Sequence, residues 1–167
     1  LSLDLHSGAT LTARAQQGVN IGFTGTGYID TVYSPNDITL TATTGSLLNA
    51  NHDKLINTLG TNVTLTAGDL THIGDIGAPG DQLNVGVNLG GGIIADASGA
   101  IHLYGPGNNF FVINSATAVT SIDLTAGLDG TINGPVTAGD SIDLTAQGTL
   151  TLTGLANVAA TSGSVTA

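Results

Sequence analysis

Ile142-Asp143-Leu144-Thr145-Ala146 is the stretch that decides the fold of this 167-residue chain, because it is one of a set of near-copies. Ile122–Ala126 repeats it residue for residue, Ile38–Ala42 differs from it only in a Thr for the Asp, and Val63–Ala67 has in addition a Val for the Ile. Apolar residues alternate with Thr or Asp in every copy, as they do in a strand that buries one face. The recurrence indicates a fold built of stacked repeats.

Degenerate copies of the phrase fill the gaps between the four clear ones. The first apolar residue of successive copies stands at positions 3, 19, 38, 63, 83, 101, 122, 142 and 165, so the mean spacing is about 20 residues. Stretches rich in Gly, Asn, Asp and Pro, such as 105–109 and 127–130, follow the copies and have the composition of turns.

Each repeat holds two or three short strands and cannot bury its apolar face alone. Residues 142–146, 149–153 and 157–159 are the strands that we expect in one such repeat. Parallel stacking at about 4.8 Å per coil buries a continuous column and pairs the backbone groups. We therefore predict an all-β fold, a right-handed parallel β-helix (β-solenoid) of about eight coils, the handedness following from the usual crossover rule. A β-sandwich is the competing fold, but it does not require a phrase repeated in register.

Composition excludes several functional classes. The chain has 25 Gly and 25 Thr, no Cys and no Glu, and 12 acidic residues against 2 basic ones, for a formal net charge of −10. Such a charge repels phosphate, so we expect no nucleic-acid partner. Disulfides are excluded, and no apolar run reaches the roughly 18 residues of a membrane span, so we expect no membrane insertion. The absence of Glu disfavours helices.

Two aromatic regions interrupt the regular pattern. Residues 70–118 are the least regular, and there we expect one of Phe110 and Phe111 to fill a wider coil interior while the other covers an outer face. The alternative is an exposed aromatic patch for a partner or a glycan. We expect a loop excursion at Tyr28–Pro35, where Tyr33 is a candidate for stacking on a glycan.

Only one pair of acidic residues falls at equivalent repeat positions, Asp123 and Asp143, which we expect to lie one coil apart. Such a pair could hold Ca²⁺ or act as acid and base, or could be two solvated surface carboxylates. No Arg or Lys accompanies the pair, so we expect no enzyme, no catalytic residues and no cofactor, with Ca²⁺ at Asp123 and Asp143 as the one weak candidate. Metal ligation needs several converging donors, so we expect isolated surface positions for the histidines, which fall in different repeats: His6, His52, His72 and His102.

Outward Thr-x-Thr pairs raise a second possibility, an ice-binding β-solenoid. The pairs are Thr39/Thr41, Thr64/Thr66 and Thr151/Thr153. A flat lattice needs such a pair in every coil, whereas other polar residues interrupt the expected row: Asn84, His102, Asp123 and Asp143. Thr on strand exteriors also reflects ordinary β propensity.

The repeats resemble those of filamentous-haemagglutinin-like adhesins. The resemblance lies in Ser-Ile-Asp-Leu-Thr-Ala at 121–126 and 141–146, and in residues 72–77, 96–103 and 136–142. It implies a Gram-negative exoprotein that is exported by two-partner secretion and folds as a right-handed β-helical rod. The Asn-Pro-Asn-Gly-Ile type of motif of the family's secretion domain is absent.

The resemblance implies a role as well as a fold. Residues 1–167 would be a single repeat segment, a piece of a longer shaft, in a secreted adhesin that mediates attachment or biofilm interactions at the outer cell surface. The partners would be host or bacterial cell-surface proteins or polysaccharides, reached through the full-length protein. Self-association is a further expectation, because uncapped strand edges can pair. The alternatives are the ice-binding solenoid and a glycan-binding module.

Overall fold

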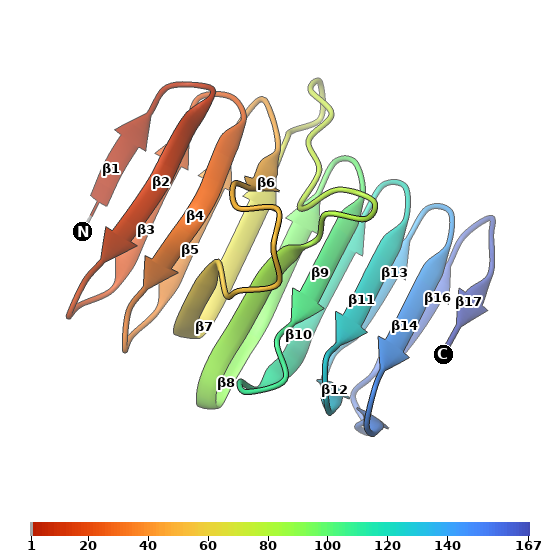
Figure 1. Ribbon diagram of the computed structural model, residues 1–167. Coiled ribbons are helices and arrows are strands. Elements are labelled where there is room, and N and C mark those ends of the chain that lie inside the picture. The colour runs from red at the N-terminus through yellow and green to blue at the C-terminus, as the bar shows by residue number, and fades with distance from the viewer. Residues whose placement is uncertain (1) are drawn as a thin grey trace.

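The structure, a computed structural model that describes residues 2–167, is a rod of stacked coils with its termini at opposite ends (Figure 1). Its strands form one 17-stranded sheet wound around the axis, and the pairings between named strands are all parallel. Most coils contribute three strands, one to each of three faces. The all-β fold and the β-solenoid of about eight turns predicted from the sequence are confirmed.

Face A is the side on which the longest uninterrupted ladder runs. It consists of β1 (Ser2–Leu5), β3 (Val19–Phe23), β5 (Ile38–Ala42), the second halves of β7 (Thr58–Ala67), β8 (Leu83–Ala97) and β10 (Phe111–Ala118), then β13 (Pro135–Ala138) and β16 (Asn157–Ala160).

Face B stacks the strands that follow face A in each coil. It comprises the first halves of β2 (Ala9–Arg14) and β4 (Gly27–Tyr33), then β6 (Leu47–Asn49), the bridge residue Ile76, β9 (Ile101–Gly105), β11 (Ile122–Ala126), β14 (Ile142–Ala146) and β17 (Val165–Thr166). Face C takes the remaining halves of β2, β4, β7, β8 and β10, with β12 (Gly130–Ile132) and β15 (Leu150–Leu152).

The repeated phrase occupies two faces rather than one, so the single series of copies read from the sequence is wrong in its register. Ile38 pairs with Val63 on face A, whereas Ile122 pairs with Ile142 on face B. On face A the next partner of Val63 is Ile93, not Leu83. Every face needs the same aliphatic pair inside and polar residues outside, so the phrase alone does not say which face a strand joins.

Inward-facing aliphatic side chains from the three faces fill the interior as one continuous core. Two aromatic rings, Phe23 and Phe111, lie in it. The ring of Phe23 fits because its neighbour is Gly27, where a Cβ would come within 2.6 Å of the ring atoms. The expectation that one of Phe110 and Phe111 fills the coil interior is confirmed, with Phe111 inside and Phe110 outside.

Longer coils in the middle of the rod carry three projecting segments. Register partners are 25 residues apart between Ile38 and Val63 and 30 apart between Val63 and Ile93. The extra residues form the 50–57 loop, the 68–75 loop and the 77–82 strap, which cluster at mid-length (Figure 1). The expected excursion at Tyr28–Pro35 is wrong, because most of that stretch is strand β4, which pairs with β2 across one β-bulge and whose tyrosines lie on the outer side.

Candidate functional site

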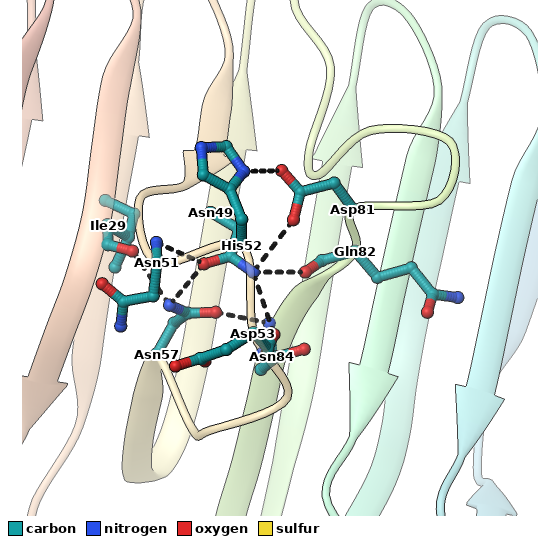
Figure 2. Close-up of polar contacts among 9 residues, drawn as sticks. All are labelled: Ile29, Asn49, Asn51, His52, Asp53, Asn57, Asp81, Gln82 and Asn84. Carbon is teal, nitrogen blue, oxygen red and sulfur yellow. Dashed lines mark hydrogen bonds and ion pairs between the residues drawn. The ribbon is translucent and has the colours of Figure 1, made fainter.

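Three asparagines fasten two of the projecting segments, the 50–57 loop and the 77–82 strap, to the rod (Figure 2). Asn57 is fully buried, and its Nδ2 donates to the carbonyl oxygens of Ile29 (2.9 Å) and Asp30 (3.0 Å) and to Oδ1 of Asn49 (3.0 Å). Its Oδ1 accepts a hydrogen bond from the Asn84 backbone N–H at 2.9 Å. The side-chain amide of Asn57 therefore bridges one coil to the next inside the protein, where an unpaired amide would be costly.

Asn84 and Asn49 extend this network to the loop and the strap. Asn84 Nδ2 donates to the carbonyl oxygens of Asp53 and Leu55, both at 2.7 Å, and so fixes the 50–57 loop over β8. Asn49 Nδ2 lies 3.2 Å from Asp81 Oδ1 and from the Gln82 carbonyl oxygen on the strap. The expectation that Asn84 interrupts a row of surface residues is wrong: the loop covers it, leaving 2% exposed.

The 77–82 strap crosses face B and is held by side chains on both sides. Asp81 Oδ2 lies 2.5 Å from Nδ1 of His52, and Gln82 Nε2 donates to Asp123 Oδ2 (3.0 Å) and to Thr125 Oγ1 (3.1 Å). His102, the register partner of Asp123, is buried at 8% exposure, and its Nδ1 has no hydrogen bond and lies 3.7 Å from Asp123 Oδ2. The expected surface position is thus wrong for His102; His6, His52 and His72 are exposed.

Asp123 and Asp143 lie on adjacent strands of face B as register partners, at the equivalent positions expected from the sequence. Asp123 already receives hydrogen bonds at both oxygens, from Gln82 at Oδ2 and from Thr125 at Oδ1 (3.2 Å), while Asp143 is exposed. Within residues 2–167 no three His, Cys, Asp or Glu side chains come together as a metal site would require. Gln82 and Thr125, both neutral, therefore occupy the Asp123 carboxylate that a cation would need as a ligand.

An aliphatic groove of about 540 Å³ lies between the 68–75 loop and face A. Leu70 is fully exposed, Ile73 is 80% exposed, and Val119 at the opposite wall is 65% exposed. The floor is formed by outward residues of face A in successive coils, Thr66, Asp96 and Thr117. Sequence reasoning did not find this groove, because its two walls are separated by some 45 residues of chain.

Asp69 organises the tight turn that carries the groove's aliphatic wall. Its Oδ1 accepts from the backbone N–H of Thr71 (2.7 Å) and of His72 (2.8 Å), and from the Thr71 hydroxyl (2.8 Å). The hydrogen bond from the Thr71 backbone, followed by those from the Thr71 and His72 side chains, holds the pKa of Asp69 well below its ordinary value. The carboxylate is thus committed to the loop and not to a ligand.

Phe110 stands beside a second, smaller groove of about 260 Å³. Its side chain is 51% exposed, and its backbone is fixed to β8 by the hydrogen bond from Val87 N–H to its carbonyl oxygen (3.0 Å). Polar and aliphatic residues share the lining: Asn108, Asn109, Val112, Leu128, Asp129 and Thr131. Phe110, but not Phe111, therefore remains available to a partner.

The two basic residues of the chain both lie over tyrosine rings. The Arg14 guanidinium is 5.5 Å from the ring centre of Tyr33, and the Lys54 ammonium is 5.4 Å from that of Tyr104. Arg14 and Tyr33 are register partners on face C. One face of the Tyr33 ring, the candidate for glycan stacking, is therefore covered by Arg14.

The Thr-x-Thr pairs do not form one row. Thr39/Thr41 and Thr64/Thr66 stack in adjacent coils of face A, whereas Thr151 belongs to β15 on face C. The coils that flank the two stacked pairs present Asn20 and Gly22 on one side and Ile94 and Asp96 on the other. The ladder is thus two coils long, far from the continuous lattice that ice binding requires, and these threonines fit a structural role.

The sequence matches no protein-family model, and comparisons with curated proteins and with solved structures also found no match. Across residues 2–167 there is no helix long and apolar enough to cross a membrane. The functional assignment therefore rests on the architecture and surface chemistry described above.

Proposed function

We propose that this chain is a non-enzymatic, load-bearing shaft segment of a secreted bacterial adhesin at the outer cell surface. The observation that supports the proposal best is the unbroken stack, in which each coil hydrogen-bonds to the next along the axis and shares one apolar core with it. Such an assembly is stiff and grows in length with each added repeat. The partners would be cell-surface proteins or polysaccharides bound by the complete adhesin.

The segments that project from the side of the rod support a shaft that also presents surfaces to partners. The asparagine network anchors the 50–57 loop and the 77–82 strap, and Ser98 and backbone hydrogen bonds anchor the 68–75 loop, so the longer coils do not interrupt the core. A spacer can therefore carry side elements without losing its continuity.

Changing the number of coils tests the spacer role directly. Ala118 and Ala138 are register partners, so deleting 119–138 removes one coil at equivalent positions, and duplicating the same residues adds one. The chain has no Cys, so His6→Cys and Ser164→Cys accept one dye each for energy transfer. The dye separation should change by about 4.8 Å per coil. An unchanged separation in both variants contradicts the proposal.

Localisation is tested separately with antibodies raised against the purified chain. Labelling of intact cells of the producing bacterium, without permeabilisation, is expected. Labelling that appears only after the cells are opened contradicts a surface location.

A glycan-binding module is the second candidate, favoured by the half-exposed ring of Phe110 beside amide, carboxylate and hydroxyl groups. An aromatic face together with a few polar groups is a setting in which a neutral sugar ring binds. Titration with neutral hexasaccharides of glucose, galactose or N-acetylglucosamine tests it. Phe110→Ser should abolish binding, whereas Val165→Ser, a similarly exposed position elsewhere, should not. Equal binding by the two variants contradicts a site at Phe110.

A further inference from the structure

The aliphatic groove beside the 68–75 loop presents apolar side chains on a loop whose polar groups are already satisfied. Leu70 and Ile73 face solvent, although burial of such aliphatic side chains is favourable. The loop's backbone is tied down on both arms: Gly68 N–H donates to the Ala42 carbonyl oxygen (2.8 Å), and Gly99 N–H donates to that of Gly74 (2.9 Å). The aliphatic wall is therefore held in place before any partner arrives.

A single serine hydroxyl locks the loop to the groove floor. Ser98 Oγ donates to the His72 carbonyl oxygen (2.8 Å) and accepts from the Gly74 N–H (2.9 Å). Because these bonds join the loop to the turn after β8, the groove has a fixed width. A fixed site loses little conformational entropy when a partner binds.

The groove carries an exposed carboxylate, that of Asp96, for which the described part of the chain supplies no ion pair. Asp96 lies on the floor between Thr66 and Thr117 and is exposed, and among residues 2–167 its carboxylate has no hydrogen bond or ion pair. The chain's two cations lie over Tyr33 and Tyr104, away from the groove. A ligand that supplies positive charge beside aliphatic groups is complementary to this surface.

The negative charge of the chain also argues against a second copy of the chain and against an anionic ligand in this groove. A second copy of the chain would bring another net charge of −10, with its Arg14 and Lys54 lying over tyrosine rings, and an anionic ligand would be repelled. A sugar would find no Phe, Tyr or Trp ring among the residues that line the groove. The floor spans three successive coils, about 10 Å, which is the reach of about three extended residues.

We propose that this groove binds a short extended segment of a cationic protein partner, with Lys or Arg over Asp96 and Leu, Ile or Val side chains against Leu70, Ile73 and Val119. This interaction surface is independent of the shaft role, since the rod can be a spacer whether or not the groove is occupied. Its failure in the test below leaves the coil-number experiment untouched.

The test measures the binding of three fluorescein-labelled synthetic hexapeptides by anisotropy at two salt concentrations. An alternating Leu–Lys peptide should bind, a Gly–Lys peptide at least tenfold more weakly, and a Leu–Glu peptide not at all. Asp96→Asn should weaken the binding of the Leu–Lys peptide at least threefold and reduce its salt dependence. Asp143→Asn, which removes an exposed carboxylate on face B, should change neither.

The apolar contribution is separated by a second pair of variants. The double change Leu70→Ser and Ile73→Ser should weaken Leu–Lys binding at least tenfold, whereas Leu155→Ser, at a leucine about as exposed as Ile73 near the C-terminal end of the rod, should not. Matching circular dichroism spectra and unfolding midpoints show that the variants are folded. The proposal is overturned if all variants bind equally, which indicates general attraction to an acidic chain, or if no peptide binds at millimolar concentration.

Discussion

Gly68 determines the geometry of the 68–75 loop. Its φ of +72° lies in the left-handed region, and a Cβ there would overlap Ser98 Oγ and approach the Gly74 nitrogen to 2.6 Å. Gly68→Ala should therefore destabilise the protein by about 1–3 kcal/mol and loosen the aliphatic groove. Urea unfolding measures the loss. Gly154→Ala, where a Cβ meets no atom within 4 Å, is the matched control and should be near neutral.

Asn57 is fully buried, and its side chain makes four hydrogen bonds. Asn57→Ala leaves the Asn84 N–H and the carbonyl oxygen of Ile29 without this partner inside the protein. The expected loss is about 3 kcal/mol in the free energy of unfolding, with faster hydrogen exchange in the 50–57 loop. Asn108→Ala, at an exposed turn, should leave both measurements unchanged. Comparable losses in the two variants would show that the network does not anchor the loop.

Asp69 gives a pH dependence whose sign follows from its lowered pKa. A carboxyl group with a lowered pKa in the folded protein stabilises the fold fully above its ordinary value of 3.8, and this contribution disappears as the pH falls further. Asp69→Asn should therefore lower the urea midpoint by a constant amount between about pH 5 and pH 8. The gap between wild type and variant should close below pH 3.8. A gap that persists unchanged at pH 2.5 contradicts a role for the ionised carboxylate.

Some site residues could be predicted from the sequence and others could not. The apolar pattern around Phe110 and Phe111 is sufficient to predict that one ring lies inside the coil and the other outside, since adjacent strand residues point to opposite sides. Asn84 was placed outward for the same reason, and its side chain does leave the strand on that side. Its burial comes from the 50–57 loop, which is about 30 residues away, and alternation within a strand carries no signal of what will cover it.

At the scale of the element, the coil is the unit that can be removed. Deletion of 119–138 rejoins β10 to the turn before β14 with every face in register, so the shortened protein should unfold cooperatively. Deletion of 119–128 removes β11 alone and brings β12, a face C strand, to the position of face B. This variant should unfold at far lower urea or aggregate. Equal midpoints for the two deletions would rule out stacking as the source of stability.

The sequence determined the strands but not their faces. The strands at 142–146, 149–153 and 157–159 were located to within two residues, because each shows a clear period of two. The phrase Ile-x-Leu-Thr-Ala was assigned to one series, although Ile38–Ala42 lies on face A and Ile122–Ala126 on face B. The 50–57 loop and the segments after it add residues of irregular number, so counting along the chain loses the phase of the repeat.

At the scale of the whole molecule, the hydrogen bonds between coils point along the rod's axis, which would also be the direction of tension on the proposed shaft segment. A pulling force would therefore open the ladder one coil at a time rather than shear all strands together. An ordinary coil of about 20 residues would release about 65 Å of extended chain when it unfolds. The coils between Ile38 and Val63 and between Val63 and Ile93 are longer, at 25 and 30 residues, and would release about 80 Å and 100 Å.

Optical-tweezer traces should then show a series of short extensions containing two distinctly larger ones, and a single rupture of the whole rod would contradict this picture. Because its coils differ in length, the protein would unfold under load in extension steps of different size. Each step would dissipate energy, and the unfolded coils would refold when the tension is released.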